Sequence, residues 1–180
     1  QEPANGWVIT GAFADDTGWD ELTKKLDGAR VGTIAVSTCE INGSDCDSNT
    51  GSILTPPFTI NQDYINFLMT GGATQVGAQL RLANTETVLL SFQPNSCDKP
   101  VLSGNDDWYH FDVRALQGQE VQLYLFDNEE GGCGFVAFDH FYQSSAAFGT
   151  TADSAGDPTA GTGVTLPGDG VSNIIGTFDD

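Results

Sequence analysis

The stretch FDVRALQGQEVQLYLFDNEEGGCGFVAFDHFY, residues 111–142, decides the fold that we expect. Apolar and polar side chains alternate along VQLYLF (121–126), which is the two-residue period of a β-strand with one buried face. A second β-rich run, GFVAFDHFY (134–142), follows the acidic and glycine-rich segment DNEEGGC (127–133). Two such runs separated by turn residues predict two strands of one sheet.

The same pattern recurs through the first three quarters of the chain. Further short β-rich runs lie at 7–10, 29–38, 52–60, 64–69, 78–82, 87–92 and 108–113. The run 52–60 contains the pair Pro56-Pro57, which predicts an edge strand or a bulged strand. Only GWDELTKKLD (18–27) has helical spacing, and Gly28 can end that helix. We therefore predict an all-β fold, a jelly-roll-like β-sandwich with one short helix.

Composition divides the chain into three parts. Residues 1–142 carry the predicted strands and all four cysteines, so we expect them to form the sandwich. Residues 143–173 are rich in Gly, Ser, Thr and Pro and contain no Lys or Arg, which is typical of a linker. Residues 174–180 (IIGTFDD) become apolar again, so they either begin a following, covalently linked module or fold back as an edge strand.

The charge of the chain limits its partners. Six Lys and Arg stand against 25 Asp and Glu, for a net charge of −19. This balance argues against nucleic acid, anionic membranes and sulfated or uronic glycans. A neutral polysaccharide or oligosaccharide, or a cation, is compatible with it, although acidity can also serve only to keep a secreted protein soluble. No apolar run approaches the length needed to span a bilayer.

Four cysteines, Cys39, Cys46, Cys97 and Cys133, indicate an oxidising and therefore extracellular location. Their spacing is not that of a zinc site. Three disulfide connectivities are possible, and the short loop between Cys39 and Cys46 favours a local disulfide there, which leaves Cys97 to pair with Cys133. Four buried free thiols are the alternative.

Alternation along three strands predicts a polar sheet face that could hold a sugar. If these strands share one sheet, planar polar groups and a tyrosine gather on its outer side, where they can hydrogen-bond to hydroxyl pairs and stack on a sugar ring. The alternative is an ordinary solvated face. The residues are Gln79, Arg81, His110, Asp112, Gln122 and Tyr124.

Two acidic features suggest calcium, which prefers oxygen ligands. Asp139 lies inside an apolar run, on the side that we expect to carry Phe135, Ala137 and Phe141, and a buried carboxylate needs a partner. That partner is Ca²⁺ or, alternatively, backbone amides or an arginine. Glu40, Asp45 and Asp47 form a second cluster, which either binds metal or is a polar loop.

No motif of a catalytic site is present: there is no nucleophile elbow, phosphate-binding loop, zinc-protease helix or complete EF-hand loop. A glycosidase needs two carboxylates at a set separation, and 25 acidic residues do not single out such a pair. We therefore expect a module that is not itself an enzyme.

Three stretches together resemble a known family: GWVITGAF (6–13), GSILTPPFTINQDYINFLMTGG (51–72) and residues 111–141. They look like the β-sandwich accessory modules attached to levanases and inulinases of glycoside hydrolase family 32, some of which bind inulin. The resemblance implies a non-catalytic, secreted module that holds a polysaccharide-degrading enzyme on β-fructan. A calcium-rigidified structural or adhesive repeat is the alternative function.

The resemblance also implies which loops surround the ligand. These include Asp127, Asn128 and Glu129, with Trp108 and Tyr109 as the first aromatic candidates and Trp19 as the next. Each of the three aromatic residues can instead belong to the core. The chain departs from the family where the usual Gly-Gly-Trp-Gly is replaced by Gly131-Gly132-Cys133-Gly134, so that a tryptophan suited to sugar stacking is absent there.

Overall fold

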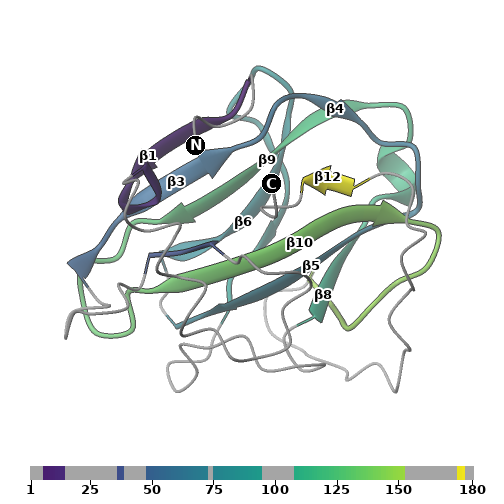
Figure 1. Ribbon diagram of the computed structural model, residues 1–180. Coiled ribbons are helices and arrows are strands. Elements are labelled where there is room, and N and C mark those ends of the chain that lie inside the picture. The colour runs from purple at the N-terminus through teal and green to yellow at the C-terminus, as the bar shows by residue number, and fades with distance from the viewer. Residues whose placement is uncertain are drawn as a thin grey trace.

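The computed structural model describes residues 6–14, 36–38, 48–72, 75–94, 108–152 and 174–176. They form two six-stranded sheets that face each other, as Figure 1 shows. The prediction of an all-β sandwich is confirmed. The helices of the described part are the short 3-10 turns η1 (Ala12–Ala14) and η4 (Arg114–Leu116), and no helix there has the length and hydropathy to cross a bilayer. The helix predicted at 18–27 lies outside the described residues.

One sheet is built around β9 (Glu120–Asp127), and we call it the β9 sheet. Its order is β1-β3-β9-β6-β7, and β4 also pairs with β9. All of its pairings are antiparallel. The other members are β1 (Val8–Gly11), β3 (Gly51–Leu54), β4 (Phe58–Thr59), β6 (Val76–Leu82) and β7 (Val88–Phe92).

The proline pair interrupts a strand inside this sheet. β3 and β4 both pair with β9, and Thr55, Pro56 and Pro57 separate them. A proline has no N–H to donate to the ladder, so the strand breaks there. Thr55 keeps contact with β9, because its N–H donates to the carbonyl of Leu123 and its Oγ1 accepts the N–H of Leu123, both at 3.0 Å. The run is therefore an interrupted strand between β1 and β9.

The second sheet is built around β5 (Tyr64–Gly71), and we call it the β5 sheet. Its order is β11-β8-β5-β10-β12, and β2 also pairs with β10. The pairing of β11 with β8 is parallel and the others are antiparallel. The other members are β2 (Val36–Ser37), β8 (Trp108–Asp112), β10 (Val136–Ser144), β11 (Thr150–Thr151) and β12 (Ile174–Gly176).

The sandwich extends beyond residue 142. β10 continues to Ser144, and β11 then adds to the edge of the β5 sheet beside β8. Gly149, which precedes β11, has a φ of +65°, and a Cβ there would lie 1.8 Å from the carbonyl oxygen of Trp108. The first part of the predicted linker thus belongs to the fold. Farther along the chain, β12 pairs with β10 at Phe141 and Tyr142.

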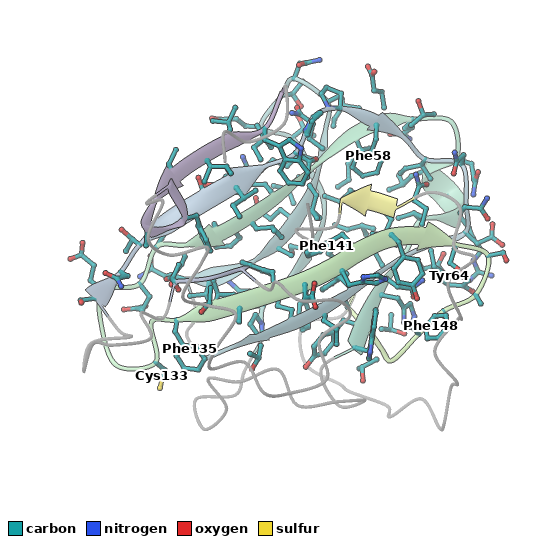
Figure 2. The ribbon with its side chains drawn as sticks, in the orientation of Figure 1. Phe58, Tyr64, Cys133, Phe135, Phe141 and Phe148 are labelled. Carbon is teal, nitrogen blue, oxygen red and sulfur yellow. The ribbon has the colours of Figure 1, made fainter. Side chains whose placement is uncertain are left out.

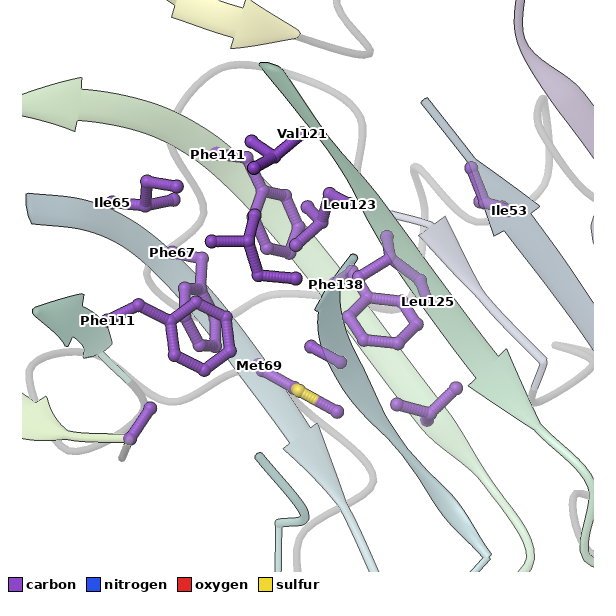
Figure 3. Close-up of a cluster of buried hydrophobic side chains, with 14 of the residues drawn as sticks. Ile53, Ile65, Phe67, Met69, Phe111, Val121, Leu123, Leu125, Phe138 and Phe141 are labelled. Carbon is purple, nitrogen blue, oxygen red and sulfur yellow. The ribbon is translucent and has the colours of Figure 1, made fainter. Parts of the chain in front are cut away.

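The core fills the space between the sheets (Figure 3). From the β5 sheet, Ile65, Phe67 and Met69 point into it at the two-residue period of a strand, and from the β9 sheet Leu123 and Leu125 do the same. All five side chains are fully buried. The alternation predicted for β9 is therefore the pattern that the fold uses.

A bulge in β10 corrects the predicted position of Asp139. The register with β5 shifts between Asp139 and Tyr142, and His140 has a φ of 53°. The extra residue places the Phe141 side chain in the core beside Phe138. Asp139 directly follows Phe138, so its side chain points to the outer side of the sheet. Asp139 and Phe141 therefore lie on opposite faces, because simple alternation does not continue through the bulge.

Candidate functional site

The outer faces of the two sheets differ in exposure. On the β5 sheet, five outward side chains of β5 and β8 are buried, with at most 7% of the surface of each exposed: Asn66, Leu68, Thr70, Trp108 and His110. On the β9 sheet, Phe126 and Gln122 are equally buried, but Gln79, Arg81 and Tyr124 are partly exposed. The edge strands of this sheet carry exposed side chains, Val8 at 55% and Val88 at 45%. The outer face of the β9 sheet is therefore the one available to a large ligand.

A second layer covers the β5 sheet. Residues 146–149 fold over it: the N–H of Phe148 donates to Asn66 Oδ1 (2.8 Å), and Asn66 Nδ2 donates to the carbonyl of Ala146 (3.1 Å). The ring nitrogens of His110 lie 2.9 Å from the Phe148 carbonyl and 3.0 Å from Thr151 Oγ1. Figure 2 shows Phe148 on the far side of this sheet from Phe141, which lies between the sheets.

This layer encloses Trp108. Its indole ring lies 6.0 Å from Tyr142 and 6.1 Å from Phe148, measured between ring centroids, and its side chain is almost fully buried. Tyr109 faces the other way, against the main core, with its ring 4.2 Å from that of Phe92. Trp108 thus has no open face for a sugar, and Tyr109 is mainly a packing residue. The third aromatic candidate, Trp19, lies outside the described residues.

Tyr142, on β10, packs against Phe148 of this layer, and its hydroxyl is buried without a hydrogen-bond partner among the described residues. Burial raises the pKa of this hydroxyl. A buried polar group without a partner costs stability. We expect Tyr142→Phe to raise the free energy of unfolding by about 1 kcal/mol, because it removes the hydroxyl and keeps the ring. Urea unfolding measures this, and a loss of stability would show that the hydroxyl makes a stabilising contact.

The outer face of the β9 sheet gathers four of the predicted sugar-site residues. β6 and β9 pair so that Gln79 lies opposite Tyr124 and Arg81 lies opposite Gln122. The prediction that these strands are neighbours is confirmed. It is wrong for His110 and Asp112, because β8 pairs with β5 in the other sheet.

Three side chains on this face stack in a row that we call the stacked row: Arg81, Tyr124 and Phe126. The guanidinium carbon of Arg81 lies 3.5 Å from the centre of the Tyr124 ring. The rings of Tyr124 and Phe126 are 5.6 Å apart and nearly parallel, at 14°. Arg81 also donates from Nε and Nη2 to Gln79 Oε1, at 2.9 and 2.7 Å. The planar groups therefore hold one another in place.

Gly77 makes room for the end of the row. It lies opposite Phe126, and a Cβ at this position would lie 3.2 Å from the Phe126 ring and 2.4 Å from the carbonyl oxygen of Phe92. Any other residue would push the ring away. Sequence alternation places Phe126 on this face, but the need for glycine at 77 follows only from the register with β9.

Gln122 has a structural role. Its Oε1 accepts the N–H of Asn84 at 2.7 Å, and its Nε2 donates to the carbonyl of Thr55 at 2.8 Å. The side chain is almost fully buried. Gln122 therefore joins the β6–β7 turn to the interrupted strand and has little left to offer a ligand.

Asp127 is fully buried at the end of β9, so it is not an open loop residue. Its carboxylate accepts hydrogen bonds from Thr38 Oγ1 and from the N–H of Glu129. Thr38 in turn accepts the N–H of Val136 at the start of β10, at 3.0 Å. Asp127 thus joins the two sheets. Thr38 lies 89 residues away in the chain, so no local pattern could indicate this contact.

In the β9–β10 loop, Asn128 is exposed and Glu129 is half-buried. Asn128 lies two residues after Phe126 and therefore on the same side of the chain, so it continues the outer face beyond the stacked row. Glu129 Oε2 accepts a hydrogen bond of 3.4 Å from Gln75 Nε2. These two residues can meet a ligand that extends past Phe126.

Metal binding stays a prediction. Asp139 is buried, and it has an interaction with a neighbouring group, so a cation is not required to compensate its burial. Among the described residues, no group of three or more His, Cys, Asp or Glu could hold a metal ion. The other predicted ligands, Glu40, Asp45 and Asp47, lie outside the described part of the chain.

Cys133 lies in the β9–β10 loop (Figure 2) and is disulfide-bonded. It has a φ of 74°. Cys39, Cys46 and Cys97 fall outside the described residues, so the pairing proposed from the sequence stays a prediction.

The chain is related to a glycosyl hydrolase. Over 148 residues it is 30% identical to a protein of Aspergillus rugulosus named "Putative glycosyl hydrolase ecdE". The match covers 76% of this chain but only 18% of the length of that protein. No protein-family model matches the chain.

Proposed function

We propose that the chain is a carbohydrate-binding module and that the outer face of the β9 sheet is its binding surface. The observation that carries this proposal is the stacked row of Arg81, Tyr124 and Phe126 on the more open of the two sheet faces. Aromatic rings beside hydrogen-bonding planar groups suit sugars, which have apolar ring faces and many hydroxyls. The relationship to a glycosyl hydrolase supports a glycan as ligand.

A neutral glycan fits this face best. The chain carries a net charge of −19, which repels anionic polysaccharides over the range at which charges are not screened by salt. The resemblance to accessory modules of levanases and inulinases makes β-fructan the first ligand to test. In this proposal the module itself is non-catalytic, acts outside the cell and serves a larger polysaccharide-degrading enzyme.

Calorimetric titration with inulin and levan oligosaccharides tests the function. A site with few hydrogen bonds and little enclosed surface should bind with a Kd of about 0.1 mM, or roughly −5.5 kcal/mol. We expect Tyr124→Ala to weaken binding about tenfold or more, which corresponds to about 1.4 kcal/mol.

Tyr64→Ala is the matched control. Tyr64 begins β5 and pairs with β8, in the other sheet, so its removal should leave the affinity unchanged. Circular dichroism checks that both variants fold. Absence of binding to inulin, levan and other neutral glycans would contradict the proposal, as would an equal loss in both variants.

A further inference from the structure

We propose that Arg81 recognises the sugar by hydrogen bonding and that Tyr124 is a positioning residue, which holds Arg81 in place. The ligand is then a neutral sugar that presents two neighbouring oxygens to the guanidinium. This inference rests on the proposed function and assigns roles within the same face. It differs from the sequence-based expectation, in which the sugar stacks on Tyr124.

The Tyr124 ring has a planar neighbour on each side. The guanidinium of Arg81 lies over the ring at 3.5 Å, and Phe126 is stacked parallel to it at 5.6 Å. The register puts these two neighbours on opposite sides, because Arg81 lies across from Gln122 and Phe126 lies two residues beyond Tyr124 on β9. While Arg81 keeps its place, one face of this ring is closed to a sugar, and Phe126 lies against part of the other.

Arg81 retains free donors in a fixed position. A guanidinium has five N–H groups, and Gln79 Oε1 accepts from only two of its nitrogens. Within the described part of the chain, no carboxylate forms an ion pair with Arg81; the ion pair found there joins Arg114 and Asp112. The cation is thus held by an aromatic ring and an amide, and its remaining donors stay available to a ligand.

The remaining N–H donors of the planar guanidinium determine which ligand fits. Parallel N–H groups suit two acceptor oxygens side by side, as on neighbouring carbons of a sugar ring. A carboxylate would satisfy the same geometry, but the strongly negative chain disfavours an anionic polymer. Stacking on Tyr124 and the bonds to Gln79 fix the guanidinium before the ligand arrives, which lowers the entropy cost of binding.

Three variants separate the roles of the two residues, each titrated with the neutral oligosaccharide that binds best. We expect Arg81→Ala to weaken binding by about tenfold or more. Arg81→Lys should lose most of the affinity too, because an ammonium keeps the charge but does not present two parallel N–H donors. Tyr124→Phe should bind nearly as well as the parent, because it keeps the ring that supports Arg81.

The contrary outcomes are distinct. If the sugar stacks on Tyr124, removal of Arg81 uncovers the ring, so that Arg81→Ala binds equally well or more tightly; that result overturns this inference and leaves the proposed function standing. If the parent chain binds no neutral glycan, that result contradicts the proposed function and, with it, the role of Arg81. Affinity for the neutral glycan should hold between about 50 and about 500 mM NaCl. Tighter, salt-sensitive binding of polygalacturonate would overturn the assignment of a neutral ligand.

Discussion

Replacement of Phe67 by alanine should lower the free energy of unfolding by about 3–5 kcal/mol, as truncations of large buried aromatic side chains do. Phe67 is fully buried at the centre of β5. Its ring lies 5.0 Å from that of Phe111 and 5.1 Å from that of Phe141, nearly parallel to the latter. Alanine would leave a cavity between rings on the two neighbouring strands, β8 and β10, which cannot both move to fill it.

Denaturant unfolding followed by circular dichroism measures the loss caused by Phe67→Ala. Val88→Ala is the control, since it also truncates an apolar strand residue but at a site that is 45% exposed. We expect it to change stability by less than about 0.5 kcal/mol. Similar losses in the two variants would mean that the core between the sheets is not packed as described.

Asp127→Ala should destabilise the fold by about 3 kcal/mol, because hydrogen bonds to a charged group contribute about 1.5–3 kcal/mol and their loss leaves buried donors without a partner. Asp127 accepts from Thr38 and from the N–H of Glu129. Thr38 also pairs with Val136 in the opposite sheet. The variant therefore breaks a connection between the sheets.

Two further variants make the Asp127 experiment specific. Asp127→Asn keeps one acceptor oxygen and the side-chain volume, so we expect about half of the loss, roughly 1–2 kcal/mol. Glu86→Ala removes an exposed carboxylate and should have almost no effect. A loss below about 1 kcal/mol for Asp127→Ala would show that the buried carboxylate does not join the sheets.

The strands of the sandwich were predictable because alternation is a local property of the chain. Val121, Leu123 and Leu125 follow the two-residue period and all face the core. That β6 and β9 share a sheet was only a condition of the sugar-site prediction, because the same polar pattern occurs in β8, which belongs to the other sheet. Membership of β8 in the other sheet could not be predicted, since that depends on which strands pair across long intervals of chain.

Local patterns failed where tertiary structure overrides them. The bulge at His140 puts Phe141 on the opposite side from Asp139, although alternation predicts one side for both, and no residue type in β10 indicates a φ of 53° there. Trp108 was an aromatic candidate for the sugar site, but Phe148 packs against its ring, and Gly149 allows this segment to approach the Trp108 carbonyl closely. The stacked row required the register of β9 with β6, which one strand alone does not contain.

Mapping of backbone amide shifts by NMR, during titration of the labelled chain with fructan oligosaccharides, tests the central claim most directly. If the β9 sheet binds the glycan, the largest shifts will fall on Gln79, Arg81, Tyr124 and their neighbours in β6 and β9. The amides of β8 and β10, in the covered sheet, will move little. Shifts concentrated on β8 and β10, or no shifts with any neutral glycan, would contradict the claim.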